Sequence, residues 1–452
     1  MEKLLLSEIV TAVQGSFGYP GDIEVASIST DTRTIEKGSV FIALKGRNFD
    51  GHDYAKKAME LGAVAVVTER AIEDAKCIIV DSTQTALLDI AGYYRDKFDI
   101  KLVGITGSVG KTTTKEFISL VMSKRFKTLK TQKNFNNEIG LPMTLFNLSK
   151  EHEAAVIEMG MSNSGEISRL SLTAKPNICV ITNIGFSHIE NLGSQENILK
   201  AKLEILDGAD ETAPLIVSKD DKLLKNVQVR ESRKLIFYSV SDSSADVYAT
   251  DIKSVGGRIE FNINCDGLVH KAVINCLGEH NVKNALAAFC VGREYNIAPE
   301  FMVQAIGEFA PDGIRQNISD INGVKIIADC YNSSPDSAKS AIRTLSQLDD
   351  NGKKIAVLGD MLELGKMSKE LHRSVGEAVC ENGIDILLCI GKFSEFYIKG
   401  AVKKGFNEKN TRIFTSKSEL AEYLKNIMSK GDSVLFKASR GMKFEEIIEM
   451  IK

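Results

Sequence analysis

The sequence predicts an α/β protein of three domains, a fold class indicated by its length and by an alternating pattern of strands and helices. At roughly 150 residues per domain, the 452 residues correspond to about three domains. From Lys101 onward, short apolar segments alternate with helical ones, as expected for parallel sheets covered by helices. Changes in this pattern place domain boundaries near residues 98 and 312, so the expected domains span residues 1–98, 99–312 and 313–452.

The two outer domains differ in the elements that their apolar runs predict. The N-terminal one is expected to be a small mixed α/β domain, with strands at Val40–Leu44, Ala63–Val67 and Cys77–Val80 and helices at Tyr54–Leu61 and Ala86–Phe98. The C-terminal one is expected to be a Rossmann-like α/β domain, with strands at Val324–Asp329, Lys354–Gly359, Ile386–Ile390 and Val434–Lys437. A helical segment follows each of these four strands.

The central domain is expected to be a parallel-sheet domain with an antiparallel addition. The expected strands are Lys101–Thr106, Ala154–Glu158 and Ile178–Asn183, and the expected helices are Thr112–Lys124 and His280–Tyr295. Asp266-Gly267 separates two further strand-like runs, Arg258–Asn264 and Leu268–Ile274. Because Asp-Gly favours a two-residue hairpin turn, these runs predict an antiparallel hairpin.

Composition and charge exclude several classes of protein. The 57 Lys and Arg against 60 Asp and Glu give a net charge of −3, which offers no attraction to nucleic acid or an anionic membrane. No stretch approaches the ~18 apolar residues of a membrane span, and the N-terminus is too polar for a signal peptide. The eight cysteines are scattered without a C-x-x-C pair. We therefore expect a reduced, cytoplasmic protein without membrane insertion and, since no coiled-coil seam is visible, a monomer.

A glycine-rich loop after the first central strand carries the strongest signal for a ligand. Gly107-Ser108-Val109-Gly110-Lys111-Thr112 follows a strand and opens a helix that continues with Thr113. This is the context of a P-loop, whose backbone wraps phosphate and whose helix N-terminus presents N–H groups to the anion. Lys111 would neutralise the β- and γ-phosphates of a nucleoside triphosphate, and Thr112 would ligate Mg²⁺. Ile105 occupies the place of the first glycine of the full motif, so the loop has the shorter G-x-x-G-K-T form.

Three further residues of the central domain are candidate metal ligands or catalytic groups. Glu158 ends an apolar strand, where a carboxylate beside a P-loop is well placed to hold Mg²⁺; the alternative is an ordinary polar strand end. His188 follows the next strand at the same edge of the sheet, although a lone histidine is more often structural. Lys202 lies on a helix, where spacing alone indicates no more than a solvated lysine.

The motifs of all three domains resemble those of the Mur ligases, ATP-dependent enzymes that form amide bonds in peptidoglycan synthesis. The resembling segments are Thr30–Arg33, Leu44–His52, Gly104–Thr113, Asn134–Pro142, Glu158–Gly160, Gly278–Asn281, Asp329–Pro335 and Val357–Gly365. The last two resemble the branch that joins D-alanyl-D-alanine to UDP-N-acetylmuramoyl-tripeptide. Ser333-Ser334 stands where that branch usually has Ala-Asn.

The resemblance implies roles that the residue pattern alone leaves open. Lys202 occupies the position at which several members carry a carbamylated lysine, whose carbamate would bind a second Mg²⁺ together with His188. The residues implied in ATP binding are Asn281, Arg315, Asp329 and Tyr331, and Arg315 is also implied as a catalytic cation at the phosphates. The residues implied in binding the two substrates are Thr30, Asp31, Arg33, Lys45, Gly46, Asn137 and Asn332.

The implied reaction activates the tripeptide carboxylate with ATP as an acyl phosphate, which the amine of D-alanyl-D-alanine then attacks. Lys111, Arg315 and two Mg²⁺ ions would offset the repulsion between carboxylate and triphosphate. The alternatives are a sister ligase that adds a single amino acid, a P-loop NTPase switch, and an inactive nucleotide-binding scaffold. Asp329-Cys330-Tyr331-Asn332 differs from the Asp-Asp-Tyr-Ala-His segment of the lysine- or diaminopimelate-adding branch. A switch leaves both outer domains unexplained, and the intact P-loop disfavours an inactive scaffold.

Overall fold

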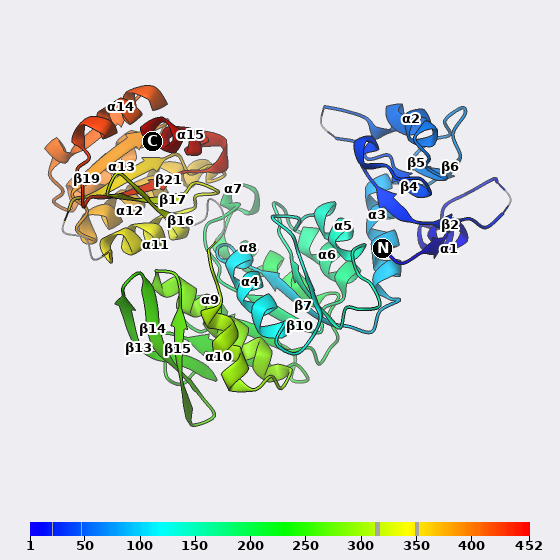
Figure 1. Ribbon diagram of the computed structural model, residues 1–452, viewed down its shortest axis with the longest axis horizontal. Helices are drawn as coiled ribbons and strands as arrows, with labels where there is room; N and C mark the ends of the chain where they lie inside the picture. Colours follow the sequence, from blue (N-terminus) through cyan, green and yellow to red (C-terminus); the bar gives the residue numbers. More distant parts are fainter. Residues whose placement is uncertain (20, 47, 312–316, 349–351) are drawn as a thin grey trace.

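A computed structural model describes the chain except for residues 20, 47, 312–316 and 349–351. In this part of the chain, the strands form a two-stranded ribbon and sheets of four, nine and six strands. The three sheets follow one another along the sequence and lie at the right, centre and upper left of Figure 1, each with its own helices. The predicted three-domain α/β architecture is therefore confirmed.

The N-terminal sheet is parallel, in the order β3–β4–β5–β6. The strands and helices of this region are β1 (Leu4–Leu5), β2 (Glu24–Val25), β3 (Ser27–Ser29), β4 (Ser39–Ile42), β5 (Ala65–Thr68), β6 (Cys77–Ile79), α1 (Leu6–Ala12), α2 (Ala55–Glu60) and α3 (Thr83–Arg95). Helix α3 also contacts the central domain: Tyr94 Oη donates to Leu148 O over 2.6 Å, and Arg95 Nε donates to Ala174 O over 2.8 Å. Because these groups are buried, one helix fixes the N-terminal domain to its neighbour.

The central sheet has the strand order β15–β14–β13–β12–β11–β10–β7–β9–β8. Its strands are β7 (Lys101–Thr106), β8 (Thr128–Lys130), β9 (Ala154–Glu158), β10 (Ile178–Ile181), β11 (Leu215–Ser218), β12 (Leu235–Ser239), β13 (Val247–Val255), β14 (Arg258–Cys265) and β15 (Leu268–Ile274). The pairs from β8 to β13 are parallel, whereas β13, β14 and β15 pair antiparallel. The predicted hairpin is therefore present, and β13 extends it to three antiparallel strands.

Strand β7 lies inside the parallel part of this sheet and is buried on both faces. Val103 and Ile105 belong to a core with α4, α9 and α10, whereas Leu102 packs in a second core with α3, α5, α6 and α8. The helices are α4 (Lys111–Met122), α5 (Gly140–Leu145), α6 (Glu166–Ala174), α7 (Ile189–Leu192), α8 (Gln195–Leu203), α9 (Glu279–Glu294) and α10 (Pro299–Gly307). Since the chain passes from β9 to β10 across β7, the carboxyl end of β7 is a topological switch point, where α/β sheets bind ligands.

The C-terminal sheet has the order β16–β17–β21–β18–β19–β20 and is parallel except for β16. Its elements are β16 (Asn317–Ile321), β17 (Val324–Asp329), β18 (Lys354–Gly359), β19 (Ile386–Ile390), β20 (Thr411–Phe414), β21 (Ser433–Lys437), α11 (Pro335–Ser346), α12 (Ser368–Glu381), α13 (Ser394–Lys403), α14 (Lys417–Ile427) and α15 (Glu445–Ile451). The four predicted strands are present, and the two that were not predicted are edge strands. No helix of the described residues is long and apolar enough to cross a bilayer.

Candidate active site

The predicted P-loop lies at the carboxyl end of β7, directly before α4. Gly107 (φ 149°) and Gly110 (φ 84°) adopt backbone conformations that residues with a side chain rarely take. A Cβ on Gly107 would also lie 1.9 Å from Thr182 Oγ1. The two glycines therefore allow the tight path of the loop, and this path leaves the first N–H groups of α4 available to an anion.

Two residues at the end of β10 hold the P-loop in place. Asn183 accepts the N–H of Val109 through Oδ1 (2.9 Å) and donates through Nδ2 to the carbonyl of Val109 (2.8 Å). Thr182 Oγ1 donates to the same carbonyl over 2.7 Å. Lys111 bends back over the loop, with its Nζ 2.7 Å from Gly107 O. The loop is thus preorganised by side chains that no sequence motif had marked.

Glu158 and Thr112 meet beside the P-loop, as predicted for a Mg²⁺ site. Thr112 Oγ1 donates to Glu158 Oε2 over 2.9 Å, and Asn136 Nδ2 donates to Glu158 Oε1 over 2.7 Å. Thr131 Oγ1 accepts the N–H of Glu158 (2.9 Å), whose side chain is buried. A carboxylate and a hydroxyl are oxygen ligands of the kind that Mg²⁺ takes together with waters and substrate phosphates. The residues therefore fit Mg²⁺, although no group of three or more His, Cys, Asp or Glu side chains forms a metal cage among the described residues.

Lys202 lies on α8 but is only 2% exposed, so it is not the solvated lysine that helix spacing alone indicated. Burial, together with the positive charge of Lys111, holds the pKa of the Lys202 amine well below its usual range. An uncharged amine is the form that reacts with CO₂, so the surroundings of Lys202 fit a carbamate.

His188 follows β10 and faces the C-terminal domain. Its ring atom Nδ1 lies 2.6 Å from Glu363 Oε2, and this contact lowers the pKa of the Glu363 carboxyl group. Two further contacts join the same loop to the C-terminal domain: Phe186 N donates to Asp336 Oδ2 (3.2 Å), and Glu190 N donates to Glu363 O (3.2 Å). Glu363 lies in a segment that resembles the Mur ligases, but the sequence assigned it no role.

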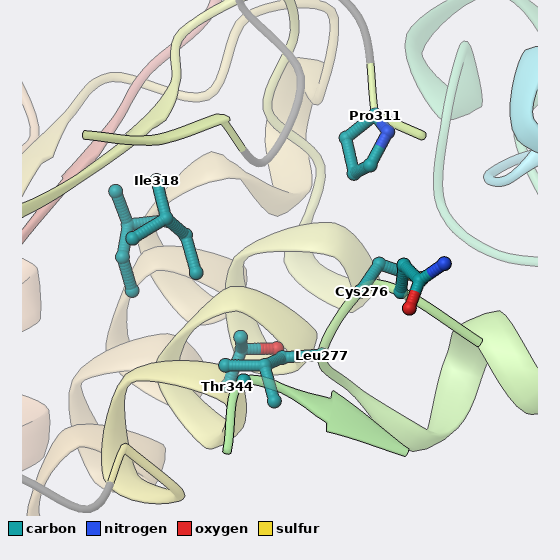
Figure 2. Close-up of a pocket in the computed structure, with 8 residues that line it drawn as sticks. Cys276, Leu277, Pro311, Ile318 and Thr344 are labelled. Atoms are coloured by element: carbon teal, nitrogen blue, oxygen red, sulfur yellow. The ribbon is translucent and has the colours of Figure 1, made fainter. Parts of the chain in front are cut away.

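A cavity of about 200 Å³ lies between the central and C-terminal domains (Figure 2). The labelled Cys276 and Leu277 come from the central domain, and Ile318 and Thr344 come from the C-terminal domain. The remaining lining residues are Gly257, Asn275, Pro311 and Ile327. Both domains therefore contribute side chains to one cavity.

A row of buried polar side chains on α9 connects this cavity with the P-loop. Asn281 Nδ2 donates to Leu277 O over 2.7 Å, and Asn284 Nδ2 donates to Asn281 Oδ1 over 3.2 Å. Asn284 Oδ1 accepts a hydrogen bond from Thr114 of α4 (3.0 Å) and would lie 2.9 Å from a Cβ on Gly110. Asn281 is therefore placed between the cavity and the phosphate loop, with its amide donating to a carbonyl just before the helix and accepting from Asn284 within it.

The C-terminal candidates lie at the end of β17 and on the loop that follows it. The Asp329 carboxylate pairs with Lys437 (Oδ2–Nζ 2.7 Å), and Lys437 Nζ also donates to Asn332 O (2.6 Å). Lys437 is buried at the end of β21 and was not predicted as a site residue. Tyr331 and Asn332 lie on the same loop, with Asn332 exposed. Arg315 lies outside the described residues.

Ser334 explains why this chain can depart from the usual Ala-Asn of its motif. It is the N-cap of α11, with its Oγ accepting the N–H of Ser337 and its own N–H donating to Ser337 Oγ (2.9 Å). Asn and Ser are about equally good N-cap residues. The replacement of Asn by Ser at this position therefore keeps the start of α11 intact.

The N-terminal candidates gather at one edge of the small sheet. Asp31 accepts the N–H of Arg33 (2.9 Å) and pairs with its guanidinium (2.6 Å), which lowers the pKa of Asp31 to about 2. Thr30 precedes this turn at the end of β3, and Lys45 and Gly46 follow the neighbouring β4. Because the two strands are parallel, their carboxyl ends share an edge. Asn137, in the central domain, lies shortly before α5 and accepts the N–H of Gly140 through Oδ1 (2.8 Å).

Comparisons with known proteins cover the whole chain. Three family models match: "Mur ligase family, catalytic domain" at residues 24–89, "Mur ligase middle domain" at 105–292 and "Mur ligase, glutamate ligase domain" at 315–440. The UDP-N-acetylmuramoyl-tripeptide–D-alanyl-D-alanine ligase of Bacillus subtilis is 40% identical over 99% of this chain and 98% of its own. The ligase of the same name from Escherichia coli is 32% identical over 100% of this chain and 99% of its own.

Solved structures agree with the sequence comparisons. A crystal structure of MurF from Acinetobacter baumannii has a TM-score of 0.93 and 30% identity, with 100% of this chain and 99% of that chain covered. MurF from Thermotoga maritima in complex with ADP has a TM-score of 0.85 and 30% identity, with 94% and 96% covered.

Proposed function

The chain belongs to the Mur ligase family, and we propose that it uses ATP to join D-alanyl-D-alanine to UDP-N-acetylmuramoyl-tripeptide in peptidoglycan precursor synthesis. Relatives at 40% and 32% identity over nearly their whole length carry this activity in their names. Within the molecule, the contact between the P-loop residue Thr112 and the buried Glu158 supports the proposal most directly. We propose a cytoplasmic monomer whose domains span residues 1–98, 99–312 and 313–452.

The reaction begins when the tripeptide carboxylate attacks the γ-phosphorus of ATP, so that an acyl phosphate forms and ADP leaves. Both reactants are anions, and the attack therefore needs positive charge at the phosphates. Lys111 and the N–H groups at the start of α4 supply it, and we assign Arg315 to the same task. Mg²⁺ held by Thr112 and Glu158 would supply further charge neutralisation. The amine of D-alanyl-D-alanine then attacks the acyl carbon, the amide forms and phosphate leaves.

We further propose a second cation site formed by His188 and a carbamylated Lys202. The buried amine supports this assignment, because burial favours its uncharged form, which reacts with CO₂ and releases a proton to give an anion that can face Mg²⁺. The matching observation would be a ¹³C carbamate resonance after incubation with ¹³C-bicarbonate. That resonance is expected in the wild-type protein and should be absent from a Lys202→Ala variant.

ATP is proposed to span from the P-loop to the cavity between the central and C-terminal domains. Helix α9 runs alongside this path, and the five steps from Glu279 to Asn284 rise about 7.5 Å along its axis. Asn281 is assigned to the adenine end, and Asp329 and Tyr331 to the ribose end, where Asp329 would exchange its contact with Lys437 for one with a hydroxyl group.

Substrate-binding roles are proposed for the polar residues of the outer domains. Thr30, Asp31, Arg33, Lys45 and Gly46 share the carboxyl edge of the N-terminal sheet and are assigned to the UDP group. Asn137, on a loop of the central domain, is assigned to the same substrate. Asn332, exposed on the loop after β17, is assigned to D-alanyl-D-alanine.

Phosphate release in an omit-one experiment tests the proposed function. Release from ATP with Mg²⁺ is expected only when UDP-N-acetylmuramoyl-tripeptide and D-alanyl-D-alanine are both present. Lys111→Ala should abolish it, whereas Lys150→Ala, at an exposed lysine of the same domain, should not. Turnover without either acceptor would establish an NTPase, and turnover with the dipeptide nucleotide and a single amino acid would establish a sister ligase.

A further inference from the structure

Glu363 of the C-terminal domain reaches His188 of the central domain at the candidate active site. Its Oε2 lies 2.6 Å from His188 Nδ1, within ion-pair distance. Both residues have φ of 63°, a left-handed conformation that costs free energy for residues with a side chain. Such strain persists where surrounding contacts enforce it, and it clusters at functional sites.

The segment that carries Glu363 is held rigidly by its own domain. Asp360 accepts the N–H groups of residues 392 and 393 over 2.8 and 2.9 Å. The next two amides along the chain donate to His372 Nε2 (3.0 Å) and to Ser439 Oγ (2.9 Å). Three consecutive residues before Glu363 are thus fixed by hydrogen bonds, which is how a scaffold holds a functional side chain in one place.

The loop that carries His188 is held from two sides. Gly185 N donates to Ser108 Oγ of the P-loop over 2.9 Å. Phe186 N donates to Asp336 Oδ2 of the C-terminal domain over 3.2 Å. The position of His188 is therefore connected both to the phosphate site and to the docking of the C-terminal domain.

We propose that Glu363 is a positioning residue, which orients the ring of His188 so that Nε2 faces the second cation site. A carboxylate beside Nδ1 keeps the ring proton on that nitrogen and leaves the lone pair of Nε2 for a metal. In the structure Nδ1 and Glu363 Oε2 are within ion-pair distance, but Nδ1 has no partner of full hydrogen-bond geometry among the described residues, so the proposed hydrogen bond requires the ring or the carboxylate to reorient. The inference rests on the proposed role of His188 as a metal ligand.

The docking of the C-terminal domain would thereby complete the cation site without adding a ligand to it. Glu363 lies on one domain and His188 on the other, so the ring is aligned only when the two domains are in contact. The C-terminal domain would then both line the cavity and align a metal ligand of the central domain.

The test compares Glu363→Gln and Glu363→Ala with Glu370→Gln, at an exposed glutamate of the same domain that forms no ion pair with any residue that the structure describes. Imidazole ¹⁵N shifts of His188 are recorded in the full-length chain labelled with ¹⁵N-histidine, and His188→Gln assigns the signals. Wild type and Glu370→Gln should carry the proton on Nδ1, whereas Glu363→Ala should move it largely to Nε2. Glu363→Gln conserves shape and folding and should give an intermediate result.

Kinetics provide a second readout. The Mg²⁺ concentration for half-maximal phosphate release should rise 10- to 100-fold in Glu363→Ala, as for other partners of metal-binding histidines, with the KM for D-alanyl-D-alanine unchanged. An unchanged tautomer in both Glu363 variants, or a change in the dipeptide KM alone, would overturn the inference. If the wild-type chain released no phosphate, the proposed function would fail, and the ¹⁵N shifts would still decide whether Glu363 positions the ring.

Discussion

Lys115→Met is predicted to loosen the loop that supports Glu158. Lys115 is 1% exposed; its Nζ donates to Thr131 O over 2.7 Å and lies 2.9 Å from Glu116 Oε1. Thr131 in turn accepts the N–H of Glu158. Methionine has a similar length, so the substitution removes the charge and its hydrogen bond without opening a large cavity.

The loss of stability in Lys115→Met follows from these contacts. A hydrogen bond from a charged donor contributes about 1.5–3 kcal/mol. Breaking a fully buried ion pair costs about 3–5 kcal/mol. Because Glu116 is 30% exposed and keeps Lys130 as a partner, loss of the Lys115–Glu116 pair adds little to the destabilisation. The expected destabilisation is therefore about 2–3 kcal/mol. Lys130→Met, at a 34% exposed lysine, should cost less than about 1 kcal/mol.

Hydrogen exchange followed by mass spectrometry is the suitable assay, because it resolves one loop within a three-domain chain. Peptides covering residues 126–136 and 154–160 should exchange faster in Lys115→Met than in Lys130→Met, while peptides of the C-terminal domain should not change. Urea unfolding should show the matching loss of stability. Equal exchange in the two variants would refute the role assigned to Lys115.

Three further predictions concern stability. Burial lowers the pKa of His372, so the unfolded chain binds a proton at this ring more readily than the folded chain. The free energy of unfolding should therefore fall as the pH drops below about 6.5. Urea unfolding of His372→Gln should show a weaker dependence on pH. Ser334→Ala should cost about 1 kcal/mol through loss of its cap, whereas Ser334→Asn should leave the unfolding midpoint unchanged. Gly376→Ala should prevent soluble expression, because the new Cβ would lie 1.9 Å from Tyr397 O. Gly92→Ala, whose Cβ meets nothing closer than 3.8 Å, should instead raise the melting temperature slightly.

The sequence predicted best the elements with strong local signals. Strand β7 runs from Lys101 to Thr106 as expected, because an apolar run is followed at once by the glycines of the P-loop. Strand β13 was not predicted, because residues such as Thr250 and Lys253 interrupt its apolar pattern; pairing with β14 stabilises it instead. The hairpin was predicted because Asp266-Gly267 is a local signal.

The site was predictable where the ends of adjoining parallel strands bring residues together. The P-loop residues and Glu158 lie on adjoining strands, so the topology of a parallel sheet brings them together. Contacts between domains carry no such signal: nothing in the sequence pairs His188 with Glu363, or Asp329 with Lys437. The burial of Lys202 was likewise invisible, because a helix position does not reveal which face another domain or strand covers.

The anchoring of α3 has a consequence for which nucleotide the enzyme accepts. If the contacts of Tyr94 and Arg95 with the central domain persist during turnover, the edge assigned to UDP and the P-loop stay at a fixed separation. The UDP group of the substrate would then be held at one end of this distance and the reactive carboxylate at the other. A peptide shorter by one residue would fall up to about 3.5 Å short of the phosphate that it must attack. The distance between the two domains would thus select for the length of the substrate peptide, without a side chain that contacts its last residue.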